Sequence, residues 1–199
     1  MGAVTGCYES RERGFYMEFE KVLTHLVSTR SYNNQVPDAE TIQKIIDAAL
    51  LSPIVRWHKL HLTVVTNKKA MALAEEAACE FVKAETRRTF MHGAPVWIIV
   101  SGIRHSDEDP WTAEWKNDNL FWNVGSIIEN MELQATALGL ASCGMNYTIV
   151  SIKNKPEVRK AVGIPDGYDA LASVVIGYSD DDIPERKVNP ELIPVSYVR

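Results

Sequence analysis

The chain has 199 residues, of which 46% are hydrophobic and 24% charged, the balance of an ordinary globular protein. Its net charge is −5 and no Lys/Arg block exceeds two residues, which argues against nucleic acid as the main partner. No run approaches the roughly 20 apolar residues of a membrane helix. Cys7, Cys79 and Cys143 are odd in number and far apart. We therefore expect a reducing, cytoplasmic location rather than a disulfide framework or a zinc site.

Hydrophobic periodicity predicts one domain over residues 17–199, after a polar N-terminal extension over residues 1–16 that lacks the apolar core of a signal peptide. Helices are expected over residues 17–28, 38–52, 68–88, 119–142 and 155–164. Strands are expected over residues 59–66, 94–103 and 169–179. Because helices outnumber strands, the pattern favours a three-layer α+β sandwich.

Three further segments shape this prediction. Residues 104–118 are polar with two Trp and one Pro, and this composition predicts a loop or lid. The helix over 119–142 is apolar almost all round, so we expect it in the centre of the molecule. The tail ends in a strand-like run over 193–198 with no nearby hairpin partner, which favours pairing with a sheet edge on another subunit.

Simple catalytic and metal motifs are weak in this sequence. Cys143 lies in a small-residue segment at the expected helix end, so a core cysteine is favoured over a nucleophile. The run HSDED (105–109) is typical of a solvated acidic loop. His58 and His61 are expected on opposite faces of a strand, so no metal site is predicted at either place. No GxGxxG or Walker loop occurs.

Polar clusters at the ends of the predicted elements are more informative. They are TRSYNN (29–34), SPIVRWHK (52–59) and ERK (185–187), with GLASCGMN (139–146) as a small-residue turn. Basic side chains, hydroxyls and free backbone N–H groups at such ends suit a phosphate group. Any one cluster alone is more often a solvated turn, so their joint order along the chain carries the information.

That order resembles the nitroreductase family of FMN-dependent flavoproteins, from about Met17 to the C-terminus. The run over 29–33 stands where the family has Arg-Arg-Ser-x-Arg, and 52–57 where it has Ala-Pro-Ser followed by Asn or His. The APVWIIV strand and the ENMELQATALGLAS helix match two further family segments. The closing Gly-Tyr and basic tail are matched by Gly177, Tyr178, Arg186 and Lys187. No single motif is specific, but five in the same order support the resemblance.

The resemblance implies a fold, an assembly and an activity. The fold is α+β: a nitroreductase-like three-layer α/β/α sandwich with a mainly antiparallel central sheet and a C-terminal tail strand exchanged in a homodimer. FMN occupies two sites at the dimer interface. Reducing equivalents pass from NAD(P)H through the flavin to a small aromatic, nitro or quinone-type acceptor, and the cofactor carries that chemistry.

The resemblance also implies cofactor contacts. The phosphate and ribityl chain are held by Arg30, Ser31 and Asn33, with cationic contacts from Arg186 and Lys187. The loop that faces the flavin ring contributes Pro53, Ile54, Trp57 and Lys59. Behind the isoalloxazine lie Gly144, Met145 and Asn146. Asn146 is the catalytic candidate, because a hydrogen bond to the reactive N5 tunes the flavin.

Acceptor contacts are expected from the 105–121 segment. Its aromatic residues Trp111, Trp115 and Phe121 either stack on an aromatic acceptor or pack in the dimer. Neither role is favoured by the sequence.

Four positions depart from the family pattern. Thr29 and Asn33 stand where Arg is usual, which removes two positive charges and lowers the expected affinity for FMN. Ile54 replaces a hydroxyl residue, and Trp57 replaces an amide or imidazole. These departures keep a second hypothesis open, a binding protein of the same fold that has lost FMN or holds another ligand. A structural dimer without a cofactor is the third hypothesis.

Overall fold

The computed structural model describes residues 17–33, 35–82, 89–106 and 109–198, and the expected extension over 1–16 lies outside them. The helices are α1 (Phe19–His25), α2 (Ala39–Leu50), α3 (Lys68–Phe81), α4 (Pro110–Ala137), α5 (Tyr147–Asn154) and α6 (Pro156–Val162). The strands are β1 (Leu60–Val65), β2 (Val96–Gly102), β3 (Ala141–Met145) and β4 (Asp169–Gly177). Within the described ranges no helix has the length and apolar character needed to span a membrane.

The four strands form one antiparallel sheet in the order β1-β2-β4-β3. Strand β2 lies inside the sheet and is buried along its whole length, as its continuous apolar run predicts. Strand β3 is an edge strand, and a parallel bridge between Ser28 and Ser142 adds the segment after α1 to its outer side.

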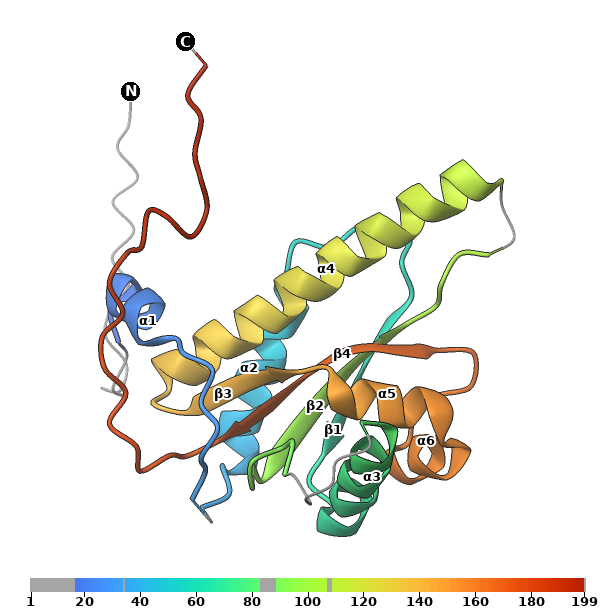
Figure 1. The fold of residues 1–199 in the computed structure, drawn as a ribbon, viewed down its shortest axis with the longest axis horizontal. Helices are drawn as coiled ribbons and strands as arrows, with labels where there is room; N and C mark the ends of the chain where they lie inside the picture. The colour runs from blue at the N-terminus through green and yellow to red at the C-terminus, as the bar shows by residue number, and fades with distance from the viewer. Residues whose placement is uncertain (1–16, 34, 83–88, 107–108, 199) are drawn as a thin grey trace, which may run out of the picture.

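Helices cover both faces of the sheet (Figure 1). Val96, Ile98 and Val100 of β2 pack in one core with residues of α2 and α4. The alternate residues Trp97 and Ile99 pack in the other core with residues of α3, α5 and α6. Side chains of alternating strand residues point to opposite faces, so β2 contributes to both layers. This confirms the expected three-layer α/β/α arrangement.

Helix α4 begins earlier than expected. Asp109 is its N-cap and accepts hydrogen bonds from the backbone N–H groups of Trp111 at 3.1 Å and Thr112 at 3.3 Å, and Pro110 occupies the first helical turn. An acidic cap followed by Pro is a favourable helix start. The loop expected over 104–118 is therefore wrong from residue 110 onward.

Helix α4 also ends earlier than expected. Gly139 adopts φ +74°, and hydrogen bonds run from Gly139 N–H to the Thr136 carbonyl and from Leu140 N–H to the Ala135 carbonyl. This left-handed glycine cap stops the helix. The chain then forms β3, where we expected the end of a helix and a small-residue turn, and α5 follows in a segment for which no element was predicted.

The long helix lies on the sheet only in part. Its N-terminal half extends beyond the sheet (Figure 1). Within the expected bounds 119–142, Leu120 and Ile127 pack in the core, but Trp122 is 76% exposed, so this helix is covered on one side only in a single chain. The expected tail strand over 193–198 is not formed either, since the described residues after β4 contain no helix or strand. Exchange of that tail with another subunit remains a prediction.

Candidate functional site

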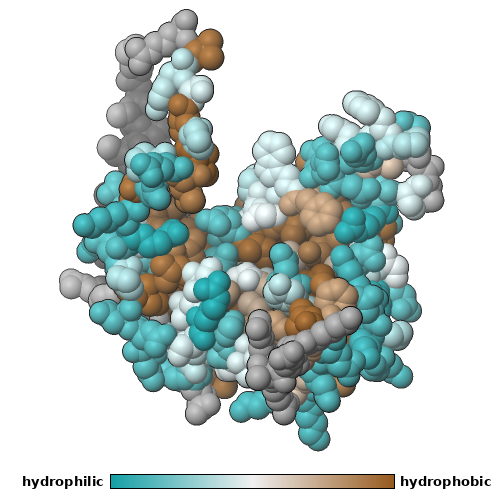
Figure 2. Space-filling view, viewed as in Figure 1, coloured by the Kyte–Doolittle hydropathy of each residue, from teal (hydrophilic) through white to brown (hydrophobic). Residues whose placement is uncertain are grey.

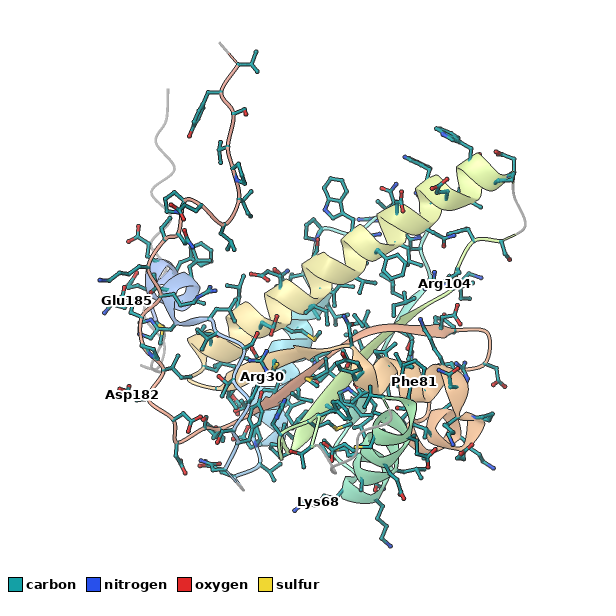
Figure 3. The ribbon with its side chains drawn as sticks, viewed as in Figure 1. Arg30, Lys68, Phe81, Arg104, Asp182 and Glu185 are labelled. Atoms are coloured by element: carbon teal, nitrogen blue, oxygen red, sulfur yellow. The ribbon has the colours of Figure 1, made fainter. Side chains whose placement is uncertain are left out.

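The segment that follows α1 runs along the edge of the sheet. The backbone N–H of Thr29 donates to the Ser142 carbonyl at 2.9 Å, next to the Ser28–Ser142 bridge. Thr29 is 6% exposed, so its own side chain is packed in the protein here and is not open to a phosphate group. Arg30 and Ser31 follow it, exposed, and Figure 3 shows Arg30 beside β3. Arg30 thus lies beside β3, with Ser31 next to it in the chain, and their contact with the FMN phosphate stays a prediction.

One face of β3 is open at Gly144. Cys143 and Met145 are buried in the core on one side of the sheet, and the alternation of strand residues directs Ser142 and Gly144 to the other side. A Cβ atom added at Gly144 would meet no other atom within 4 Å. A flat ring can therefore approach the backbone here. Met145 can contribute only its backbone to that face, because its side chain is buried.

Asn146 follows β3 as the N-cap residue of α5. Its side chain is exposed and makes no hydrogen bond to the helix end that it caps. The amide therefore remains available to a ligand that lies over Gly144.

Burial shifts the pKa values of two ionisable groups near β3. Burial raises the pKa of the Cys143 thiol, although the Arg30 guanidinium opposes that shift. Burial also raises the pKa of Glu132, whose carboxylate accepts a hydrogen bond from the Ser142 hydroxyl at 3.2 Å. Cys143 is thus a neutral core thiol, which agrees with the interpretation favoured from the sequence, although it lies on a strand.

Two of the expected phosphate residues are engaged elsewhere. The Asn33 amide donates to the Asp180 carboxylate at 2.8 Å, and its side-chain oxygen accepts from the Gln35 N–H at 2.9 Å. Arg186 donates from Nη2 to the Leu23 carbonyl at 3.2 Å, which fixes the tail to α1. Lys187 follows it, exposed.

The 52–59 loop is attached to the middle of α4. The Ser52 hydroxyl donates to the Ser126 carbonyl at 3.3 Å, and the Val55 N–H donates to the Asn123 side-chain oxygen at 3.3 Å. These bonds hold the loop on the surface. The expected ligand residues of the loop are all exposed, namely Pro53, Ile54, Trp57 and Lys59.

Trp57 does not stand alone but belongs to an indole–imidazole cluster made of Trp57, His58, His105 and Trp115. The Trp57 ring centroid lies 3.9 Å from that of His58, 5.5 Å from that of His105 and 6.1 Å from that of Trp115. The Lys116 ammonium lies 5.6 Å from the Trp57 ring centroid. No sequence pattern predicts that His58 lies near His105, because His58 follows α2 and His105 follows β2.

The remaining aromatic candidates lie on α4 and not on a loop. Phe121 is partly exposed, with the Arg104 guanidinium 4.9 Å from its ring centroid, and Trp111 lies near the helix start. Trp122, which the sequence reading missed, is also exposed. Hydrophobic residues gather in the hollow between the tail and α4 (Figure 2). In the part of the chain that the structure describes, no three His, Cys, Asp or Glu side chains are grouped to hold a metal ion.

Comparison with known proteins identifies the family to which this chain belongs. The sequence model of the nitroreductase family matches residues 27–178. The chain belongs to the nitroreductase family. The match contains Arg30, the 52–59 loop, α4 and β3, whereas the basic tail with Arg186 and Lys187 lies outside it.

Individual members of the nitroreductase family align with this chain over most of their length. A protein of Archaeoglobus fulgidus described as a "putative NADH dehydrogenase/NAD(P)H nitroreductase" is 25% identical over 78% of this chain and 82% of its own. Nitroreductase structures with bound FMN from Desulfitobacterium hafniense and Bacteroides fragilis are both 24% identical and give TM-scores of 0.75 and 0.71. Each alignment covers 91% of this chain, with 98% and 100% of the respective relative. These structures support the fold.

Proposed function

We propose that the chain is an FMN-dependent oxidoreductase. It passes reducing equivalents from NAD(P)H through the bound flavin to a small aromatic, nitro or quinone-type acceptor. The observation that carries the proposal is the position of the exposed Arg30–Ser31 pair beside the open face of β3 at Gly144. Membership of the nitroreductase family and the FMN-bound relatives support the same assignment.

The residues beside β3 fit FMN in chemistry. Arg30 supplies a guanidinium and Ser31 a hydroxyl for the phosphate and ribityl chain, and Lys187 adds a cation from the tail. The open backbone at Gly144 leaves room for the flavin ring. The side-chain amide of Asn146, which does not cap α5, can hydrogen-bond the edge of that ring. When bound, the flavin supplies hydride transfer between NAD(P)H and the acceptor. The protein orients the ring and excludes water around it.

The active assembly in this proposal is a homodimer. Large apolar residues that a monomer would leave in water lie on α4 and on the tail, namely Trp111, Trp115, Phe121, Trp122, Leu192, Ile193, Val195, Tyr197 and Val198. Such surfaces mark interfaces between proteins. A groove of about 300 Å³ between α1, α2 and the end of α4 is lined mostly by apolar residues, including Phe19, Val22 and Leu51. That groove suits the apolar tail of a second copy.

The test is the visible spectrum of the purified protein. We expect a yellow protein whose absorption band at about 450 nm, typical of a bound flavin, is bleached by NADH or NADPH and restored by an acceptor. A colourless protein that takes up no added FMN would exclude the oxidoreductase proposal.

A second candidate is a binding protein of the same fold without FMN. The observation that favours it is the hydrogen bond from Asn33 to Asp180, which removes one expected phosphate ligand and places a carboxylate near the site. Trp57 favours it too, because an indole provides only one N–H donor at a position where relatives have an amide or imidazole. Titration with FMN separates the two candidates.

A further inference from the structure

Three buried hydroxyl groups form a network at the end of β3, where the chain turns into α5 (Figure 1). Ser173 of β4 is 2% exposed, and its hydroxyl donates to the Met145 carbonyl at 2.8 Å. The hydroxyl oxygens of Thr148 and Ser173 lie 3.4 Å apart, and the Ser151 hydroxyl donates to the Thr148 carbonyl at 2.6 Å. Burial of a hydroxyl is unfavourable unless hydrogen bonds compensate it. This network thus connects α5 and β4 to β3 through the Met145 carbonyl.

The direction of the Met145 carbonyl determines where the following N–H points. The described residues contain no cis peptide bond, so the C=O of Met145 and the N–H of Asn146 point in opposite directions. The carbonyl points toward Ser173, which pairs with Met145 in the sheet. The Asn146 N–H therefore points away from β4, toward the outer edge of β3.

The outer edge of β3 is the edge at which the proposed FMN site lies. Thr29 donates from this side to the Ser142 carbonyl at 2.9 Å, and Arg30 follows beside β3 (Figure 3). Gly144, where the strand is open, lies between Ser142 and Asn146 in the chain. Among the described residues, no backbone carbonyl accepts from the Asn146 N–H. This N–H is thus a donor on the same edge as Arg30, next to the open position.

We propose that Ser173 is a positioning residue for the flavin. Its hydroxyl holds the Met145 carbonyl, and with it the whole peptide plane, so that the Asn146 N–H faces N5 at the edge of the ring. The inference rests on the proposed function, since it concerns how the same site holds its flavin. A donor that the protein interior already fixes needs no reordering when the ring binds.

The experiment compares FMN with 5-deaza-FMN, in which a C–H group replaces N5. Both molecules carry the same phosphate and ribityl chain, but only FMN offers an acceptor to the Asn146 N–H. Fluorescence titration of the full-length chain, depleted of bound flavin, gives both affinities. Wild-type protein should bind FMN about three- to tenfold tighter than 5-deaza-FMN, which is the contribution of one hydrogen bond.

Three variants assign this preference to Ser173. Ser173→Ala should reduce the preference for FMN to within about twofold, while its affinity for 5-deaza-FMN stays within about twofold of wild type. Ser173→Cys keeps the size of the side chain and a weak donor, so it should retain part of the preference. Ser151→Ala is the matched control, because it removes an equally buried hydroxyl that donates to Thr148 and not to Met145. It should keep the full preference.

Failure of the positioning role and failure of the oxidoreductase proposal give different results. A full preference in Ser173→Ala overturns the positioning role, as does an equal loss of both affinities, because the hydroxyl would then act only on stability. Should Ser173→Ala not fold, a full preference in Ser173→Cys overturns it. Wild-type protein that binds both flavins equally overturns the positioning role alone. Wild-type protein that binds neither flavin overturns the oxidoreductase, and the positioning role with it.

Discussion

The side-chain amide of Asn33 donates a hydrogen bond of 2.8 Å to the carboxylate of Asp180. This contact joins the segment expected to hold the FMN phosphate to the acidic run 180–182. In the family pattern an Arg is usual at position 33, and its replacement by a neutral residue bonded to a carboxylate reverses the local charge. In the proposed site the phosphate contacts would therefore depend chiefly on Arg30, Ser31 and Lys187.

Removal of the Asp180 carboxylate should tighten FMN binding. In Asp180→Ala the Asn33 amide is released and a negative charge near the phosphate is lost. Because both groups are exposed, we expect a decrease in Kd of up to about fivefold at low ionic strength, and less at high salt. Fluorescence titration of FMN measures the change. Asp182→Ala removes the same charge without a bond to Asn33, and an equal effect there would show that the hydrogen bond is irrelevant.

Loss of Arg30 should have the opposite and larger effect. Arg30→Ala removes the guanidinium beside β3, and charge-assisted hydrogen bonds of this kind contribute about 1.5–3 kcal/mol. We expect FMN affinity to fall about 10- to 100-fold, without loss of thermal stability. Lys160→Ala on α6 is a control with the same change in charge. Unchanged retention of FMN in Arg30→Ala would contradict the phosphate assignment.

The sequence predicted the layers of this fold better than its element boundaries. The apolar run in β2 and the periodicity of α2 were sufficient to predict these two elements, because burial of a strand or of one helix face requires apolar residues at regular positions. The start of α4 was missed although Asp109–Pro110 is a recognisable cap, since the polar residues around it suggested a loop. Strand β3 was missed because Ala, Ser, Cys and Gly carry no strand preference, and pairing with β4 determines its conformation.

The site was predictable in part for similar reasons. Arg30, Ser31 and Gly144 were proposed from the order of motifs, and the bridge between Ser28 and Ser142 places their two segments side by side at one sheet edge. The contacts of Asn33 with Asp180 and of Trp57 with His105 join residues far apart in sequence. No local pattern encodes such pairs, so they required the structure.

Glu132 should make stability depend on pH. Burial raises the pKa of its carboxyl in the folded protein, so the folded state holds the proton more tightly than the unfolded state. Stability should therefore fall as pH rises from the ordinary glutamate pKa through the raised one. Glu132→Gln keeps an acceptor for Ser142 and removes this loss, so the variant should exceed wild type in urea midpoint at pH 7 but not at pH 4. A difference that is independent of pH would contradict this account.

The apolar tail should hold the dimer together. Val195 is exposed in the single chain, and Val195→Glu would place a charge within the proposed interface. We expect wild-type protein to sediment as a dimer and Val195→Glu to dissociate at micromolar concentration, with loss of FMN. Ser196→Glu adds the same charge at the neighbouring polar position and should remain dimeric. Dimers of equal stability in both variants would show that the tail lies outside the interface.

The most direct test of the proposed flavin position is the affinity for FMN after the open face of β3 has been blocked at Gly144. In Gly144→Val the new side chain meets no protein atom within 4 Å of its Cβ, and Gly144 does not require a positive φ. The melting temperature should therefore stay near that of wild type, while FMN affinity falls by about 100-fold or more because the ring can no longer approach the strand. Gly144→Ala should give a smaller loss. FMN binding that persists unchanged in a stably folded Gly144→Val protein would contradict the central claim that the flavin lies over β3.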